Sequence, residues 1–271
     1  MKIAGIQFSC SADKKKNTEK ALTFLSIAYE KGAKIVCFQE IFNLFWFPRE
    51  RNEKFFDLAD EVKSPIFEPF FERAREYGIV IVLPFFERSE KRFYNSCMVI
   101  NEKGELSGIY RKVHLTQAPL WEEDYYFSRG ENFPVFVTGY GRIGVEISWD
   151  NLYPEVTRIL ALKGAEIIFA PTSCAFKTQH IWEKVISGNA IANGLYIMRV
   201  NRVGSEDLQD FYGMSFCVNP EGEVIAGPAG LHDGIVLAEI DLEYEKYVRD
   251  TWPLLRMRIP EMYSELVHQG Y

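Results

Sequence analysis

The sequence predicts an α/β fold in which two β-sheets share one domain, residues 1–271, with helices outside them. Helical patterns alternate with short apolar strands along the chain. A helix end, a glycine and a buried strand occur twice, at 31–38 and again at 163–169, which indicates two related halves. No polar linker rich in Pro, Gly or Ser divides these halves, so we expect both sheets to share one core.

The first half contains two helices, each followed by a strand. The helix at 17–31 has apolar residues at helical spacing and is followed by Gly32. The second helix opens at Ser64-Pro65, runs to Tyr77 and is ended by Gly78. The expected strands are 35–38, 79–86, 95–100 and 106–113, the last two forming an antiparallel hairpin around the turn 101–104.

The second half repeats this alternation. Segments 133–137 and 142–147 form a strand pair around the turn 139–141. The next elements are a helix at 154–163, a strand at 167–169, a helix at 182–193 and strands at 196–200, 214–218, 223–226 and 235–240.

The composition excludes several classes of protein. With 31 Lys and Arg against 38 Asp and Glu, the net charge is −7, which disfavours a nucleic-acid partner. The longest apolar run, 78–86, is far shorter than the ~20 residues of a membrane span, so we expect no membrane partner. The N-terminal segment is too interrupted for a signal peptide, so we expect a cytoplasmic protein.

The five cysteines and four histidines are scattered and show no metal-ligand spacing. We therefore expect reduced thiols and no metal site.

Three polar residues stand at the ends of expected strands, where a rigid scaffold can aim a reactive group. They are Glu40, Lys112 and Ser148. Ser148 lies on a strand-to-helix turn, where backbone N–H groups can bind a developing oxyanion. The sequence therefore predicts an active site built from these positions.

The segments 38–40 (FQE), 110–115 (YRKVHL) and 144–150 (GVEISWD) resemble the three signature blocks of the nitrilase superfamily of carbon–nitrogen hydrolases. The similarity covers essentially the whole chain. It implies a four-layer αββα sandwich with two mixed sheets and pseudo-symmetric halves, and no cofactor. It also implies a homo-oligomer, at least a dimer, with outer helices packed across subunits. The Phe-rich helix 67–77 and the segment after Trp182 could supply that surface.

The resemblance assigns a role to four residues. Glu40 would be the general base, Lys112 the cation that stabilises the tetrahedral intermediate, and Glu123 a second, orienting carboxylate. Position 148 would be the nucleophile. The implied reaction is attack on a carbamoyl or amide carbon, loss of ammonia or amine, and hydrolysis of a thioester-type intermediate by water activated at Glu40.

The family has cysteine where this chain has Ser148. A hydroxyl is a much weaker nucleophile than a thiol without a strong base beside it, and losing the nucleophile can cost on the order of 10⁶ in rate. Three interpretations stay open: a deliberate Cys-to-Ser replacement, a natural amide-binding pseudoenzyme or scaffold, and a true serine enzyme. The survival of the other three positions favours the first.

The C-terminal half is most similar to the branch that contains N-carbamoylputrescine and β-ureidopropionate hydrolases, which implies an N-carbamoyl amine or small aliphatic amide as substrate. Trp121 and Trp149 are the aromatic residues nearest the catalytic positions and are expected to line the pocket. The other expected substrate-binding residues are Asn151, Thr172 and Cys174.

The far end of the substrate is less constrained by the sequence. Asn151 and Leu152 stand where related D-amino-acid carbamoylases have arginines that grip a carboxylate. The acidic run 122–124 would suit a cationic end such as a polyamine.

A remote alternative is a dinucleotide-binding oxidoreductase, because residues 139–144 match the pattern GxGxxG. That fingerprint requires a helix to begin within it, whereas 145–147 is typical of a strand. The pattern therefore favours a hairpin turn.

Overall fold

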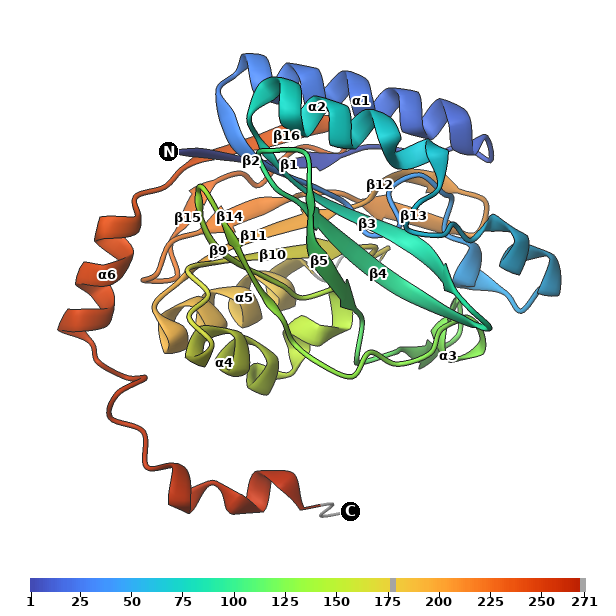
Figure 1. The fold of residues 1–271 in the computed structure, drawn as a ribbon. Coiled ribbons are helices and arrows are strands. Elements are labelled where there is room, and N and C mark those ends of the chain that lie inside the picture. The colour runs from blue at the N-terminus through green and yellow to red at the C-terminus, as the bar shows by residue number, and fades with distance from the viewer. Residues whose placement is uncertain (176–178, 269–271) are drawn as a thin grey trace.

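The computed structural model describes residues 1–175 and 179–268, and two six-stranded mixed β-sheets form its centre (Figure 1). The first sheet has the order β16-β1-β2-β3-β4-β5. Its strands are β1 (Lys2–Gln7), β2 (Ala33–Phe38), β3 (Val80–Ser89), β4 (Arg92–Ile100), β5 (Leu106–Arg111) and β16 (Gly234–Glu239). The second sheet has the order β15-β14-β11-β10-β9-β8. Its strands are β8 (Val135–Thr138), β9 (Gly141–Val145), β10 (Ile167–Thr172), β11 (Tyr196–Asn201), β14 (Phe216–Val218) and β15 (Val224–Ala226).

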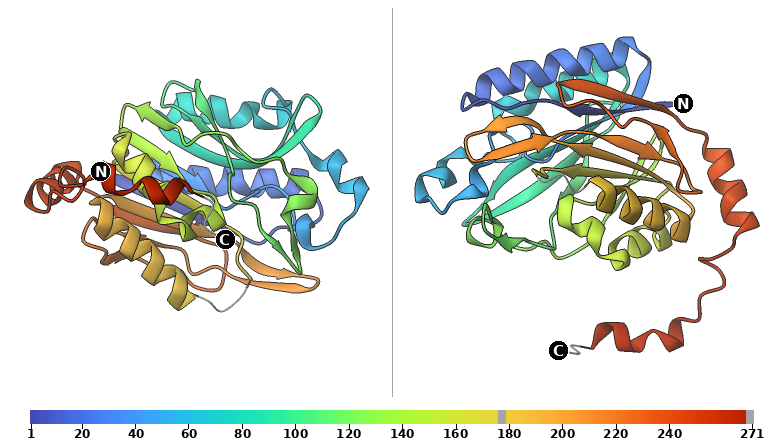
Figure 2. Two further views of the ribbon diagram at one scale, coloured as in Figure 1. Left: turned by 90° about the horizontal axis from the view of Figure 1, so that it is seen from below. Right: turned by 180° about the vertical axis from the view of Figure 1, so that it is seen from behind.

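A layer of helices covers the outer face of each sheet (Figures 1 and 2). Helices α1 (Lys14–Glu30) and α2 (Glu68–Tyr77) lie on the first sheet, and α4 (Pro154–Leu162) and α5 (Gln179–Asn193) lie on the second. The other helices are α3 (Glu123–Tyr126) and α6 (Leu242–Thr251). None of the helices in the described ranges is long and apolar enough to span a bilayer. The predicted αββα fold with two mixed sheets is confirmed.

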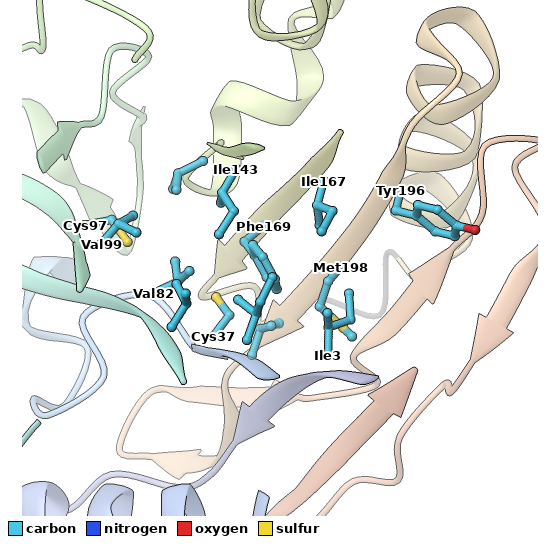
Figure 3. Close-up of a cluster of buried hydrophobic side chains, with 14 of the residues drawn as sticks. Ile3, Cys37, Val82, Cys97, Val99, Ile143, Ile167, Phe169, Tyr196 and Met198 are labelled. Carbon is cyan, nitrogen blue, oxygen red and sulfur yellow. The ribbon is translucent and has the colours of Figure 1, made fainter. Parts of the chain in front are cut away.

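The inner faces of the sheets meet in a core that holds the two halves together (Figure 3). Cys37 and Val82 enter it from the first sheet, and Phe169 and Met198 enter it from the second. All four side chains are fully buried. Burial of this kind contributes roughly 1.5–3 kcal/mol for each large apolar side chain.

The two halves follow the same plan. In each sheet three consecutive strands are parallel, β1-β2-β3 in one and β9-β10-β11 in the other, and the flanking pairs are antiparallel. Gly32 precedes β2 and Gly164 precedes β10, and both have φ of +89°. A glycine tolerates this left-handed conformation at little cost, so each ends its helix and turns the chain into a sheet.

Several elements were not predicted. Among them are β1, helices α3 and α6 and two short hairpins. The hairpin strands are β6 (Gln117–Ala118), β7 (Trp121–Glu122), β12 (Val203–Glu206) and β13 (Gln209–Tyr212). Strand β5 ends at Arg111, so Lys112 follows the strand and does not lie within it.

The GxGxxG pattern lies in the β8-β9 hairpin, in which Val137 pairs with Arg142 and Thr138 with Gly141. No helix begins within it. Because the pyrophosphate site of the fingerprint requires that helix, the dinucleotide interpretation is wrong.

The prediction that the Phe-rich helix offers a surface to a second subunit is also wrong for its main apolar face. Phe67, Phe70 and Ala74 are fully buried against the first sheet of the same chain. Exposed apolar residues occur instead on the C-terminal arm, residues 252–268, which runs away from the sheets after α6 (Figure 1).

Candidate active site

Three of the predicted catalytic side chains lie together in the interior. Glu40 follows β2, Lys112 follows β5, and Glu123 begins α3. The Lys112 Nζ is 3.1 Å from Glu40 Oε1 and 2.6 and 2.8 Å from the two carboxylate oxygens of Glu123. All three residues are buried, so one ammonium group joins two carboxylates in a site sheltered from solvent.

Both carboxylates are also held by hydrogen bonds. The Asn95 side-chain amide donates to Glu40 Oε1 at 2.8 Å, and the Thr116 backbone N–H donates to Glu123 Oε2 at 2.8 Å. The second oxygen of Glu40, Oε2, is buried and has no hydrogen-bond partner within the described part of the chain. Since buried polar atoms are normally paired, this oxygen is available to receive a proton from a substrate or nucleophile.

The charges in this cluster depend on one another. Burial alone lowers the pKa of Lys112, but attraction to Glu123 and Glu40 outweighs burial and raises it above the ordinary lysine value. Burial raises the pKa of Glu123, which Lys112 lowers and Glu40 raises further. Lys112 therefore remains an ammonium ion at neutral pH, able to stabilise negative charge that develops beside it.

Ser148 opens a short 3₁₀ turn, Ser148–Leu152, just beyond β9. Its φ is +49°, in the left-handed region that residues with a side chain rarely adopt. Such strain is typical of turns that present a nucleophile. The residue is 5% exposed, so it reaches a cavity and not the open surface.

Asp150 holds this turn in place. Its carboxylate accepts hydrogen bonds from the Ile147 backbone N–H at 3.1 Å and the Tyr110 hydroxyl at 2.6 Å. It also accepts from the His114 backbone N–H at 3.0 Å, and the His114 ring lies 2.8 Å away. The buried carboxylate thus links the turn after β9 to the segment that carries Lys112.

A cavity of about 210 Å³ lies beside Ser148. It is lined by Thr116, Ala118, Trp121, Ser148, Trp149, Leu152, Ser173, Cys174, Ile181 and Trp182. Thr116 connects the cavity to Glu123, and the Ser173 hydroxyl donates to the Glu40 backbone carbonyl at 3.4 Å. Because it is smaller than the ~300–1,000 Å³ of ordinary ligand pockets, the cavity suits a small substrate.

Comparisons with known proteins identify the family. A model of the carbon–nitrogen hydrolase family matches residues 2–250. The chain belongs to this family. It is 35% identical to an N-carbamoylputrescine amidase of Solanum lycopersicum, over 98% of this chain and 94% of the relative. It is also 35% identical to a citrullinase of Francisella tularensis, over 99% of both chains. The crystal structure of a carbon–nitrogen hydrolase from Helicobacter pylori G27 matches with a TM-score of 0.93 and 34% identity, covering both chains completely.

The cavity of this carbon–nitrogen hydrolase includes three of the five residues expected to bind substrate, Trp121, Trp149 and Cys174. The other two do not line it. The Thr172 hydroxyl donates to the Ala170 carbonyl, and the Asn151 amide donates to the carbonyls of Glu146 and Ser148. Both side chains therefore hold the backbone beside the site, and their contact with a substrate stays a prediction.

The acidic run 122–124 is neutralised within the hydrolase itself. Glu122 forms an ion pair with Arg51 at 2.7 Å, and Asp124 lies 4.0 Å from the same guanidinium. Glu123 faces Lys112. Glu122 and Asp124 therefore already face a cation of the same chain, and the expectation that this run receives a cationic end of the substrate stays a prediction. Glu123 is the one member of the run that belongs to the buried cluster.

Sequence reasoning missed the residues that hold the hydrolase site in place, namely Asn95, Thr116 and Asp150. Asn95 contacts Glu40 only because β4 pairs beside β3, and Thr116 contacts Glu123 through its backbone. Asp150 lies in the segment 144–150 (GVEISWD), and an acidic residue two positions after residue 148 was the available signal. In the described ranges no three His, Cys, Asp or Glu side chains are grouped as a metal site would require.

Proposed function

We propose that the chain is built to hydrolyse a non-peptide carbon–nitrogen bond, in an N-carbamoyl amine or a small aliphatic amide, through a covalent intermediate at position 148. The observation that carries this proposal is the buried Lys112 ammonium between Glu40 and Glu123. Two residues that line the cavity beside Ser148 contact this cluster, Thr116 at Glu123 and Ser173 at the Glu40 backbone. The small, uncharged lining of that cavity supports a compact neutral group at the reacting end.

In the proposed mechanism, the side chain at position 148 attacks the carbonyl carbon while Glu40 Oε2 takes its proton. Lys112 stabilises the oxyanion of the tetrahedral intermediate. The carbon–nitrogen bond then breaks, and the departing amine or ammonia takes the proton back from Glu40. Water, deprotonated by Glu40, next attacks the covalent intermediate. The bond to residue 148 breaks, residue 148 takes the proton back from Glu40, and the acid product leaves. Glu123 keeps Lys112 charged and oriented throughout.

Ser148 makes the present chain a poor catalyst in this scheme. With a thiol at this position the intermediate is a thioester; a hydroxyl must instead be activated by Glu40 alone. We infer that the machinery is intact and that the weak nucleophile limits it. The alternative, an amide-binding pseudoenzyme or scaffold, is favoured by Ser148 itself and predicts saturable amide binding without turnover.

The test is Ser148→Cys, assayed for ammonia release from a panel of aliphatic amides and ureido compounds. We expect a gain in kcat on the order of 10⁶, about 8 kcal/mol in the barrier, by analogy with removal of the nucleophile from a serine-protease triad. Ser173→Cys is the matched control, because it adds a thiol to the same cavity away from the strained turn, and we expect no gain. Absence of ammonia release from Ser148→Cys would contradict the proposal.

We also propose that residues 1–271 fold as one domain and that two copies associate. The support for association is the C-terminal arm, on which large apolar side chains are more than half exposed. They are Trp252, Met257, Ile259, Met262, Leu266 and Val267. Since soluble monomers rarely expose apolar residues in such a series, a second copy is the proposed cover.

A further inference from the structure

Arg199 is a fully buried arginine whose guanidinium lies among aromatic rings and has no acidic partner among the described residues. It lies on β11, and among its guanidinium nitrogens Nη2 donates to the Tyr212 hydroxyl at 2.9 Å. The Nε and Nη1 donors are buried without a hydrogen-bond partner. No carboxylate of the described residues forms an ion pair with Arg199. An unpaired buried charge is costly, so this residue calls for an explanation.

Arg202, three residues further along, shows how the same fold satisfies a buried arginine. Its Nη1 contacts Glu206 Oε1 at 2.8 Å. Its other donors reach the backbone carbonyls of Glu40, Ile41 and Leu44 and the Ser173 hydroxyl. Arg202 is therefore a structural residue that forms an ion pair with Glu206. Arg199, in contrast, has two donors without an acceptor and no acidic partner among the described residues.

The position of Arg199 connects it to the substrate cavity. Its Cζ lies 4.9 Å from the centre of the Trp182 ring, 5.5 Å from that of Tyr212 and 5.9 Å from that of Phe216. Trp182 and Cys174 both line the cavity. The guanidinium therefore lies behind Trp182 in the wall of the cavity, while the described lining itself carries no charged side chain.

We propose that Arg199 forms an anion subsite at this end of the cavity and receives a carboxylate carried by the far end of the substrate. The ligand class is an amide or ureido compound with a carboxylate a few bonds from the reacting carbon. Nε and Nη1 lie on different edges of the planar guanidinium, so each can donate one charge-assisted hydrogen bond to a carboxylate oxygen. The carboxylate would reach them between the Trp182 ring and the Cys174 thiol and would supply the missing counter-charge.

The inference rests on the proposed function only in that the cavity accepts an amide, and it explains how a carboxylate is held although Asn151 and Leu152 carry no charge. It can be tested by binding to the chain as it stands, without turnover. Isothermal titration would compare glutaramate, which has an amide and a carboxylate, with pentanamide, which lacks the carboxylate. We expect glutaramate to bind roughly 10- to 100-fold more tightly, as a charge-assisted pair provides.

Arg199→Met should remove this preference and leave the affinity for pentanamide unchanged. Arg199→Lys should restore part of it, since it returns the charge without the planar donors. Arg75→Met, on the exposed surface of α2, is the matched control for loss of one positive charge and should keep the full preference.

The proposal is overturned if glutaramate binds no more tightly than pentanamide to the unaltered chain. It is equally overturned if Arg199→Met weakens both ligands in parallel, which would mean that Arg199 only supports Trp182. Acetate that binds at Arg199 while glutaramate gains no advantage would contradict the substrate assignment. Failure of the hydrolase proposal is a separate result, recorded as absence of ammonia release from Ser148→Cys.

Discussion

At the scale of single residues, burial sets the charges on which the chemistry depends. Lys112 is held as an ammonium ion by two carboxylates, and Glu40 keeps one buried oxygen without a partner. Another carboxyl group, Glu146, lies two residues before Ser148 and is also fully buried. Burial raises the pKa of Glu146 to about 8, with Thr157 opposing and Asp150 reinforcing the shift.

Glu146 should make the stability of the protein fall as pH rises. Its pKa is higher in the folded state than in the unfolded state, so between pH 4.5 and about 8 unfolding releases a proton and the free energy of unfolding decreases. We expect Glu146→Gln, which imitates the neutral acid, to remove up to about 1.4 kcal/mol per pH unit of this slope. Urea unfolding of both proteins at pH 5 and pH 8 measures this change in the free energy of unfolding.

Glu245, whose pKa is raised to about 7, also makes the free energy of unfolding fall as pH rises. It does so equally in Glu146→Gln and in the unaltered chain, so its contribution cancels when the two are compared. Parallel stability profiles for Glu146→Gln and the unaltered chain would show that Glu146 is ionised in the folded state.

Only some of the site residues could be predicted from the sequence. Glu40, Lys112 and Ser148 could be predicted because each follows an apolar strand and lies in a recognisable motif. Asn95 and Arg199 could not be singled out. The role of Asn95 depends on strand pairing, and Arg199 occupies an ordinary strand position whose lack of an acidic partner is a property of the packed structure.

At the scale of elements, the turn Ser148–Leu152 is the feature that positions residue 148, the proposed nucleophile. A strand-to-helix turn was predictable from the change of pattern after residue 147. The left-handed backbone at Ser148 was not, because serine has no preference for it, and only the surrounding contacts impose it. Asp150 holds the residue before Ser148 through the Ile147 N–H, and the Asn151 amide donates to the Ser148 carbonyl.

Asp150→Ala should therefore damage both stability and activity. It leaves the Tyr110 hydroxyl and two backbone N–H groups buried without an acceptor, each costing about 1–3 kcal/mol. We expect a loss of at least about 3 kcal/mol in the free energy of unfolding, measured by urea denaturation.

Asp150→Asn keeps one acceptor oxygen and should lose less. In the Ser148→Cys background, both changes should lower kcat more than they raise KM, since the turn presents the nucleophile. An Asp150→Ala protein as stable as its parent would refute the role given to this carboxylate.

At the scale of the whole molecule, the two sheets and their helices followed from the alternation of elements and from the repeat at 31–38 and 163–169. The path of the C-terminal arm did not, because short-range patterns do not report where a segment lies relative to the body. Strand β1 was missed for a related reason: its six residues are predominantly buried by neighbours distant in sequence.

The arm should determine assembly. We expect the full chain to elute at twice its own mass in size-exclusion chromatography with light scattering. Ending the chain at Thr251 should weaken association at least tenfold, because it removes the exposed apolar series. The double change Met257→Asp and Met262→Asp should act in the same direction. A monomeric full chain, or a truncated chain that still dimerises equally well, would rule out this role for the arm.

The most direct test of the account is the intact mass of Ser148→Cys, quenched in acid during turnover of the amide that it hydrolyses fastest. The account predicts a mass increase equal to the acyl or carbamoyl group of the substrate, mapped to residue 148 and lost when Lys112→Met is added. No adduct, or an adduct carried by Cys174 instead, would contradict the claim that the Glu40, Lys112 and Glu123 cluster serves a nucleophile at position 148.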